Sequence, residues 1–155
     1  MSEVGQLLRD HPFMAGLSDE HVAAMEACEA VPVRFEAGKR ILEEGQDADG
    51  CFFIEDGDVA LELCNVGLQC FTVQTIHAGD VIGWSWLYSP QKWTFDAVAV
   101  NEVAALRLNA ALLKDAMDAD AAFGYELMHR FSEVIISRLQ ATRSQFIDVL
   151  PISGR

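Results

Sequence analysis

Residues 82–100, IGWSWLYSPQKWTFDAVAV, contain all three tryptophans of the chain: Trp84, Trp86 and Trp93. Each indole offers a large planar face and one N–H donor, which suits the wall of a pocket for a planar or apolar ligand. Lys92, beside Trp93, can add one positive charge. In an extended segment Trp84 and Trp86 would share a face, because they are two residues apart. The segment therefore predicts a common aromatic wall, either packed shut or open to a ligand.

Catalytic chemistry is not favoured by the other reactive side chains. The chain has no G-x-S-x-G or H-E-x-x-H motif, and its histidines are far apart in the sequence. They are His11, His21, His77 and His129. We therefore expect no enzyme.

The four cysteines form no C-x-x-C pair, and each lies in an apolar stretch. They are Cys28, Cys51, Cys64 and Cys70. This pattern predicts reduced, buried thiols that pack as small apolar side chains. A metal site of Cys64, Cys70 and His77 is the weaker alternative, since the spacing matches no strong metal-binding pattern. We therefore expect no metal.

Composition narrows the class of protein. The 155 residues are 51% hydrophobic and 23% charged, enough for one compact domain with a core. The net charge of −13, from 24 acidic and 11 basic residues, makes the chain a poor partner for nucleic acid. No apolar run is long enough to span a membrane, and the N-terminus lacks a signal pattern, so we expect a cytoplasmic protein.

The elements that position the tryptophan segment follow from the pattern of apolar and turn residues. Residues 1–30 read as helical, with Ser18 as a helix N-cap. Residues 31–108 contain short β-rich runs separated by Gly, Asp and Asn, as in an antiparallel sandwich or jelly roll. We expect one domain over residues 1–155, of the α+β class.

A long helix is predicted over residues 118–150, capped by Asp118 or Asp120. Its apolar stripe has steps of three or four residues: Phe123, Leu127, Phe131, Ile135, Leu139, Thr142, Phe146 and Leu150. A helix of roughly 42 Å would overhang a small β domain. We therefore expect a homodimer through residues 121–150, the alternative being that the helix folds back on its own domain.

The segment GKRILEEGQDADGCFFIEDGDVAL (38–61) resembles the opening half of the cyclic-nucleotide-binding domain of the catabolite activator protein and of protein kinase A regulatory subunits. HAGDVIG (77–83) looks like the turn that leads into that family's phosphate-binding cassette. RLQAT (138–142) is similar to the start of the contact between the long C-terminal helix and the base. The resemblance implies an eight-stranded jelly roll with flanking helices and a ligand inside the roll beneath the last helix.

The cassette departs from the family pattern at both anchoring residues. The resemblance implies a glutamate for the ribose hydroxyl and an arginine for the cyclic phosphate. Here Trp84 stands at the glutamate position, and Trp93 or Thr94 at the arginine position. Asp96 would repel a phosphate if it pointed inward. Because a buried phosphate without its arginine loses a few kcal/mol, we expect no tight binding of cAMP or cGMP.

Three alternatives remain for the cassette: a pocket filled by tryptophan, a cradle for another small planar ligand, or residual cyclic-nucleotide binding through Lys92, Thr94 and backbone near Gly83. Thr142 either reaches over the pocket or lies on the helix surface. The candidate ligand-binding residues are Gly83, Trp84, Ser85, Trp86, Lys92, Trp93, Thr94 and Thr142.

The sequence therefore predicts a stand-alone regulatory or sensor domain. A true cyclic-nucleotide signalling protein and a ligand-free protein-interaction scaffold are the alternatives. Because only PISGR follows Leu150, we expect no helix-turn-helix and no direct DNA binding. A protein partner is possible for such a module.

Overall fold

The computed structural model describes residues 2–67 and 69–150. The N-terminal part consists of α1 (Glu3–Asp10), a 3-10 turn η1 (Pro12–Met14) and α2 (Asp19–Glu26). Ser2 and Ser18 cap the two α-helices, each accepting a hydrogen bond from a backbone N–H of the first turn. The predicted cap at Ser18 is confirmed.

Eight strands form two four-stranded antiparallel sheets in the described part of the chain. One sheet has the order β1 (Val31–Phe35), β8 (Val103–Asn109), β3 (Gly50–Asp56), β6 (Val81–Ile82). The other has the order β2 (Arg40–Leu42), β7 (Asp96–Ala99), β4 (Val59–Cys64), β5 (Cys70–Ile76). A second 3-10 turn, η2 (Ser85–Leu87), lies between β6 and β7. The predicted jelly roll with flanking helices is confirmed.

Tight turns between the strands require glycine at some positions. Gly57, between β3 and β4, has φ +93°, and a Cβ there would lie 2.3 Å from the carbonyl oxygen of Glu102. Only glycine avoids both the left-handed strain and this contact. The two sheets can therefore approach closely at this corner, and side chains such as Phe53, Ile54 and Leu106 fill the interior without exposure.

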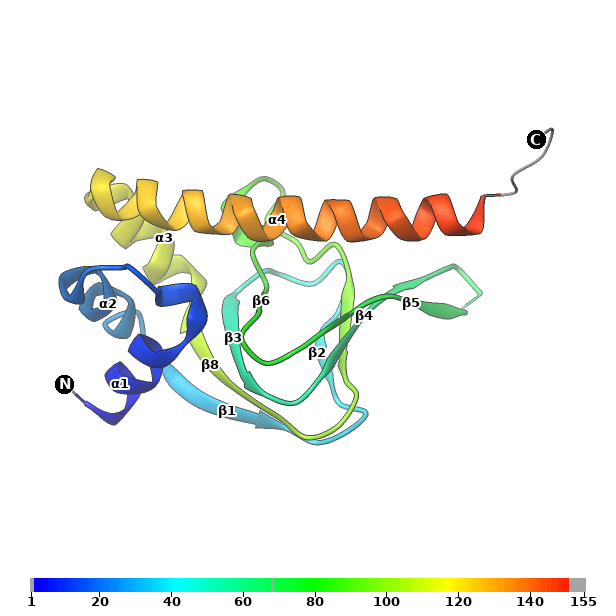
Figure 1. Cartoon of the computed structure of the whole chain (residues 1–155), viewed down its shortest axis with the longest axis horizontal. Coiled ribbons are helices and arrows are strands. Elements are labelled where there is room, and N and C mark those ends of the chain that lie inside the picture. Colours follow the sequence, from blue (N-terminus) through cyan, green and yellow to red (C-terminus); the bar gives the residue numbers. More distant parts are fainter. Residues whose placement is uncertain (1, 68, 151–155) are drawn as a thin grey trace.

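Two helices follow the roll: α3 (Ala110–Ala119) and α4 (Ala121–Val149). The second is the predicted long helix, with the predicted cap at Asp120. The break falls at Asp120, whose extended backbone ends α3 and whose carboxylate accepts from the N–H groups of Ala122 and Phe123 at the start of α4. The last helix crosses the roll and projects beyond it, in the same direction as the β4–β5 hairpin (Figure 1).

The predicted apolar stripe of α4 divides into two parts. Phe123, Leu127 and Phe131 are fully buried against the chain's own core. Leu139 and Phe146, farther along, are 66% and 60% exposed. The fold-back alternative therefore describes the first half of the helix, and the second half keeps an uncovered apolar surface in this chain.

The prediction of four reduced thiols is wrong for two cysteines. Cys64 and Cys70 form a disulfide, because the register of β4 and β5 places them directly opposite each other. The apolar stretch around each cysteine suggested buried thiols and gave no sign of this pair. Cys28 and Cys51 are free and buried, as predicted. His77 lies at the other end of this hairpin, where it pairs with Asp58.

Among the described residues, no helix combines the length and the hydropathy needed to cross a bilayer.

Candidate ligand-binding site

A cavity of about 50 Å³ lies between the roll and α4. Its walls come from both sheets, from the segment between β6 and β7, and from the helix. Apolar side chains provide much of the lining: Leu42, Leu61, Val73, Ile82 and Phe95. Since one water needs roughly 10–15 Å³ on this measure, the cavity has room for a few water-sized groups.

Six of the eight candidate residues line this cavity: Gly83, Trp84, Ser85, Trp93, Thr94 and Thr142. Gly83 allows the chain to turn there, since its φ is +86° and a Cβ would come within 3.0 Å of both the Gly50 carbonyl oxygen and the Trp93 ring. Trp93 is only 5% exposed and so occupies much of the interior below Gly83. The segment beyond β6 therefore forms a wall of the cavity.

Two candidates, Trp86 and Lys92, lie elsewhere. The expectation that Trp86 shares a face with Trp84 is wrong, because residues 85–87 form the 3-10 turn η2 instead of an extended strand. The Trp86 indole donates to the Gly83 carbonyl at 2.7 Å, and its ring packs edge-on against Phe131 in the core. Lys92 forms an ion pair with Asp47 at the surface, away from the cavity lining.

Asp96 is buried but satisfied within the second sheet. Its carboxylate accepts a hydrogen bond of 2.7 Å from the Glu44 backbone N–H and lies 3.8 Å from the Arg40 guanidinium. It does not line the cavity. The condition for the expected repulsion of a phosphate, an inward-pointing Asp96, is therefore not met.

Sequence reasoning missed Arg138, which enters the cavity from α4. It is 8% exposed, and its Nη2 donates to the Val81 carbonyl at 2.7 Å and lies 4.0 Å from Asp80. The guanidinium carbon is 4.9 Å from the centre of the Trp84 ring, a cation–π contact. A weak signal was available, since Arg138 is seven residues after the buried Phe131 and therefore on the inward face of the helix.

Burial lowers the pKa of the Arg138 guanidinium to about 10, and the nearby Asp80 carboxylate opposes this shift. The group therefore remains positively charged at neutral pH. Among the described residues it is the one charged side chain that lines the cavity. One turn later, the exposed Thr142 also lines the cavity.

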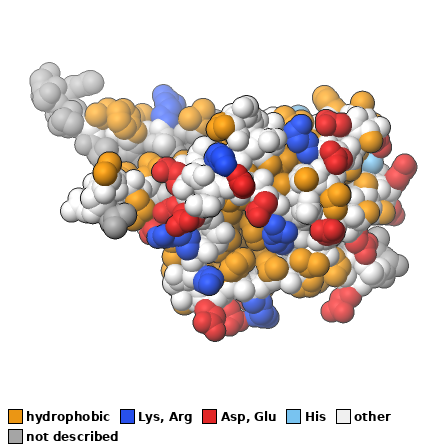
Figure 2. Space-filling view, turned by 180° about the vertical axis from the view of Figure 1, so that it is seen from behind, with side chains coloured by type: hydrophobic (Ala, Val, Ile, Leu, Met, Phe, Trp, Pro, Cys, Tyr) orange, Lys and Arg blue, Asp and Glu red, His pale blue; other side chains and the backbone are white. Residues whose placement is uncertain are grey.

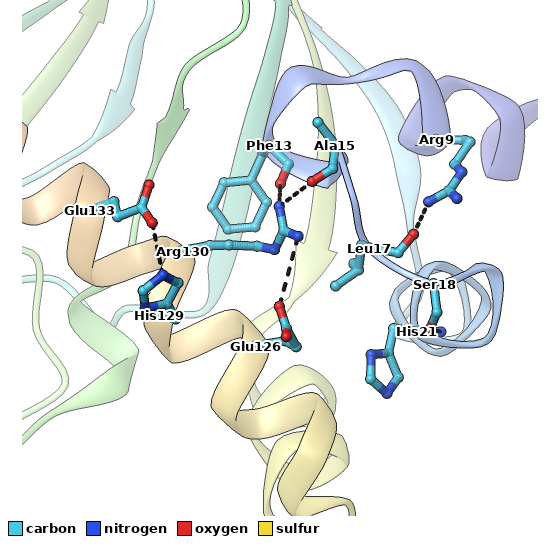
Figure 3. A network of polar contacts seen from close by, with 10 residues as sticks. All are labelled: Arg9, Phe13, Ala15, Leu17, Ser18, His21, Glu126, His129, Arg130 and Glu133. Carbon is cyan, nitrogen blue, oxygen red and sulfur yellow. Dashed lines mark hydrogen bonds and ion pairs between the residues drawn. The ribbon is translucent and has the colours of Figure 1, made fainter.

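Arg130 fixes the first half of α4 to the N-terminal segment (Figure 3). Its Nη1 donates to the carbonyls of Phe13 and Ala15 at 2.7 and 2.8 Å, and its Nη2 lies 3.8 Å from Glu126 of the same helix. The helix that covers the cavity is thus attached at its beginning to η1 and the turn after it.

Residues 32–120 match the family model described as "Cyclic nucleotide-binding domain", and the chain belongs to this family of regulatory domains. No curated protein matches the sequence.

Solved structures of similar fold include a putative cyclic nucleotide-binding protein from Geobacter metallireducens. It is 27% identical, with a TM-score of 0.77 over 90% of this chain and 99% of that one. A cyclic nucleotide-binding domain from Methylobacillus flagellatus has a TM-score of 0.82 at 14% identity, over 98% of this chain and 88% of that one. The regulatory subunit of a cAMP-independent protein kinase A from Trypanosoma brucei has a TM-score of 0.67 at 21% identity, over 83% of this chain and 45% of that one.

Proposed function

We propose that this chain is a regulatory module that senses a ligand other than cAMP or cGMP in the cavity beneath α4. The main support for this proposal is the set of residues that line the cavity. Trp84 lines it where the resemblance places the family's glutamate, Trp93 and Thr94 line it where one or the other takes the place of the arginine, and its cation comes from α4.

The volume of the cavity supports this proposal. Pockets for drug-sized ligands typically measure about 300–1,000 Å³. A cavity of about 50 Å³ holds much less, because Trp93 fills the space next to Gly83. Binding of a nucleotide would require the tryptophan walls to move.

The position of Lys92 also supports it. Residual binding of a cyclic phosphate through Lys92 would require that side chain to leave Asp47 and enter the roll. The similarity to a regulatory subunit described as cAMP-independent indicates that this fold can accompany regulation without cAMP.

A ligand in this cavity could act through the position of α4. Arg138 and Thr142 of the helix contact the cavity directly, and Arg130 ties the same helix to the N-terminal segment. A ligand that binds one position of the helix better than another shifts the population towards it. The output would then be a changed surface on α4 for a second copy of the chain or for a protein partner.

Charge argues against DNA as the direct partner. The net charge is −13, and Lys and Arg side chains are scattered singly among acidic ones on the face shown in Figure 2. Neutralisation of phosphates by clustered Lys and Arg supplies most nonspecific DNA affinity. We propose that signalling proceeds by protein contact.

A thermal-shift titration with cAMP and with cGMP at millimolar concentration tests the proposal. A ligand at a hundred times its dissociation constant stabilises the folded state by about 2.7 kcal/mol, which corresponds to a shift of roughly 5–11 °C for a chain of this size. We expect no saturable shift with either nucleotide. A saturable shift would contradict the proposal and favour a cyclic-nucleotide signalling protein.

A ligand-free scaffold is the second candidate function, and the small volume of the cavity is the observation in its favour. In that case Trp93 and its neighbours would simply complete the core. The two candidates differ at Arg138, since a scaffold has no use for a buried cation that faces a cavity.

A further inference from the structure

The guanidinium of Arg138 is only half satisfied. Its Nη2 has the Val81 carbonyl as an acceptor, whereas its Nη1 is buried and has no hydrogen-bond partner among the described residues. Buried donors in folded proteins are nearly always paired. Because Arg138 also lines the cavity, an acceptor bound there can supply the missing partner of Nη1.

The surroundings hold this guanidinium in a fixed orientation. Trp84 stacks against it at 4.9 Å, and the Val81 carbonyl fixes its other nitrogen. Both partners belong to the roll, whereas Arg138 belongs to α4. Nη1 therefore needs little reorganisation to bind an acceptor.

The chemistry of the ligand follows from charge. Asp80, at 4.0 Å and about half exposed, compensates the positive charge of Arg138 only in part. A single negative charge in the cavity would complete the compensation, whereas a doubly charged phosphate would exceed it. The planar carboxylate matches the guanidinium geometry.

The walls of the cavity define the rest of the ligand. Apolar side chains such as Leu61, Val73 and Phe95 suit a short carbon skeleton, and the hydroxyl groups of Ser85 and Thr142 suit its polar atoms. The volume of about 50 Å³ restricts the skeleton to a few carbon atoms.

We propose that the cavity binds a small carboxylate, whose oxygens accept hydrogen bonds from Arg138 Nη1. This inference rests on the proposed function, since it names the ligand class of the same sensing cavity. The cation thus comes from the covering helix instead of the β6–β7 segment. Occupation of the cavity would satisfy the buried donor and hold α4 against the roll.

Tryptophan fluorescence provides the test, because Trp84 stacks on Arg138 and Trp93 lines the cavity. The protein is titrated with sodium propionate at constant ionic strength, with sodium chloride as the balancing salt. Propionamide, which has the same shape without the charge, is titrated in parallel. We expect a saturable change with propionate and at least about tenfold weaker binding of propionamide, since charge-assisted bonds are the stronger ones.

Arg138→Lys is the key variant, because lysine retains the positive charge but carries it on a compact ammonium group, which does not place donors where Nη1 lies. We expect at least about tenfold weaker propionate binding than in the wild type. Arg143→Lys is the matched control, since Arg143 is exposed on the same helix and lies outside the cavity lining, and its affinity should equal that of the wild type.

Equal responses to propionate and propionamide would overturn the proposal, and so would a wild type that does not respond to propionate. Should Arg138→Lys fail to fold, the comparison of propionate with propionamide on the wild type decides alone. The parallel titration with cAMP separates the two proposals. No response to either cAMP or propionate overturns only the carboxylate inference. Binding of cAMP without binding of propionate overturns both the proposed function and the carboxylate inference.

Discussion

Trp84 and Arg138 are best understood as a pair. The tryptophan stands where the family resemblance places a glutamate, and its ring packs against the guanidinium that α4 supplies. A glutamate at position 84 would place a carboxylate beside a guanidinium in this cavity and compete with a ligand anion. The aromatic ring instead supports the cation and leaves its Nη1 free. Trp84 in place of the glutamate is therefore compatible with a cation that comes from α4.

Gly83→Ala tests how tightly the wall of the cavity is built. An added Cβ would meet both the Gly50 carbonyl and the Trp93 ring at 3.0 Å, with the backbone at φ +86°. We expect a loss of about 2–4 kcal/mol in the free energy of unfolding, from left-handed strain and overpacking together. Urea denaturation followed by circular dichroism measures it.

Gly45→Ala is the matched control for that change. Gly45 has φ +88°, but nothing lies within 4 Å of its added Cβ. It should cost only the backbone strain of roughly 1–2 kcal/mol. Equal losses in the two variants would show that the contact of Gly83 with Trp93 is unimportant for packing.

At the scale of residues, the sequence predicts which residues form the cassette wall better than it predicts that Arg138 supplies the cation. Gly83, Trp84, Trp93 and Thr94 could be placed because glycine and tryptophan spacing survives in one local segment. Arg138 was not singled out, although the RLQAT stretch that resembles the helix contact begins with it, because an arginine within a helix usually faces solvent. Its role depends on how α4 lies over the roll, which local pattern does not define.

Among the elements, α4 contains two segments with different environments. The first is buried through Phe123, Leu127 and Phe131. The second exposes Ile136, Leu139, Phe146 and Leu150, whose steps of three, seven and four residues fit the heptad spacing found in coiled coils. The homodimer predicted from the sequence would use this seam, and it stays a prediction.

Leu139→Glu tests the homodimer. Because Leu139 is 66% exposed in the single chain, the substitution should leave the fold intact. Two glutamates facing each other in the seam should dissociate the dimer at micromolar concentration, as light scattering after gel filtration would show. Ser144→Glu, at an exposed position of the same helix outside the seam, should leave the dimer unchanged. A wild type that is monomeric throughout would refute the prediction.

The elements also show where local pattern reaches its limit. The jelly roll and the long final helix were predictable because alternation, glycine turns and the apolar stripe recur over many residues. The 3-10 turn at residues 85–87 was not, since it depends on a few residues. Asp120, in contrast, was one of the two predicted caps, and it does cap α4. The Cys64–Cys70 disulfide could not be predicted either, because it depends on the register between β4 and β5. Only the pairing of the two strands defines that register.

For the whole molecule, His11 joins the N-terminal helices to the roll. Its Nδ1 accepts from the Phe13 N–H at 3.2 Å, so the proton resides on Nε2, which donates to the Ile54 carbonyl at 2.9 Å. Burial lowers the pKa of His11, although the Ile54 carbonyl and Asp80 oppose the shift. The folded protein therefore keeps this ring neutral.

This neutral ring predicts how stability depends on pH. A histidine in the unfolded chain has a pKa near 6.5, so below about pH 6.5 the unfolded state binds a proton that the folded state excludes. The free energy of unfolding should thus fall as the pH is lowered from 7 to 5, by at most about 1.4 kcal/mol per pH unit from this group. His11→Gln should flatten that dependence in urea denaturation series.

His129→Gln is the control for the pH series, since His129 is exposed on α4, where it pairs with Glu133 and stacks on Tyr125. It should retain the slope of the wild type. An unchanged slope in His11→Gln would assign the pH dependence to other groups.

The projection of α4 beyond the roll gives it the mechanics of a lever. At about 1.5 Å per residue, the helix extends ~10 Å from Phe131 to Arg138 and ~27 Å from Phe131 to Val149. A tilt of about 10° around Phe131 therefore moves Arg138 by about 2 Å and the far end by about 5 Å. A displacement of about 2 Å at Arg138 would thus become more than twice as large at the exposed far end of the helix.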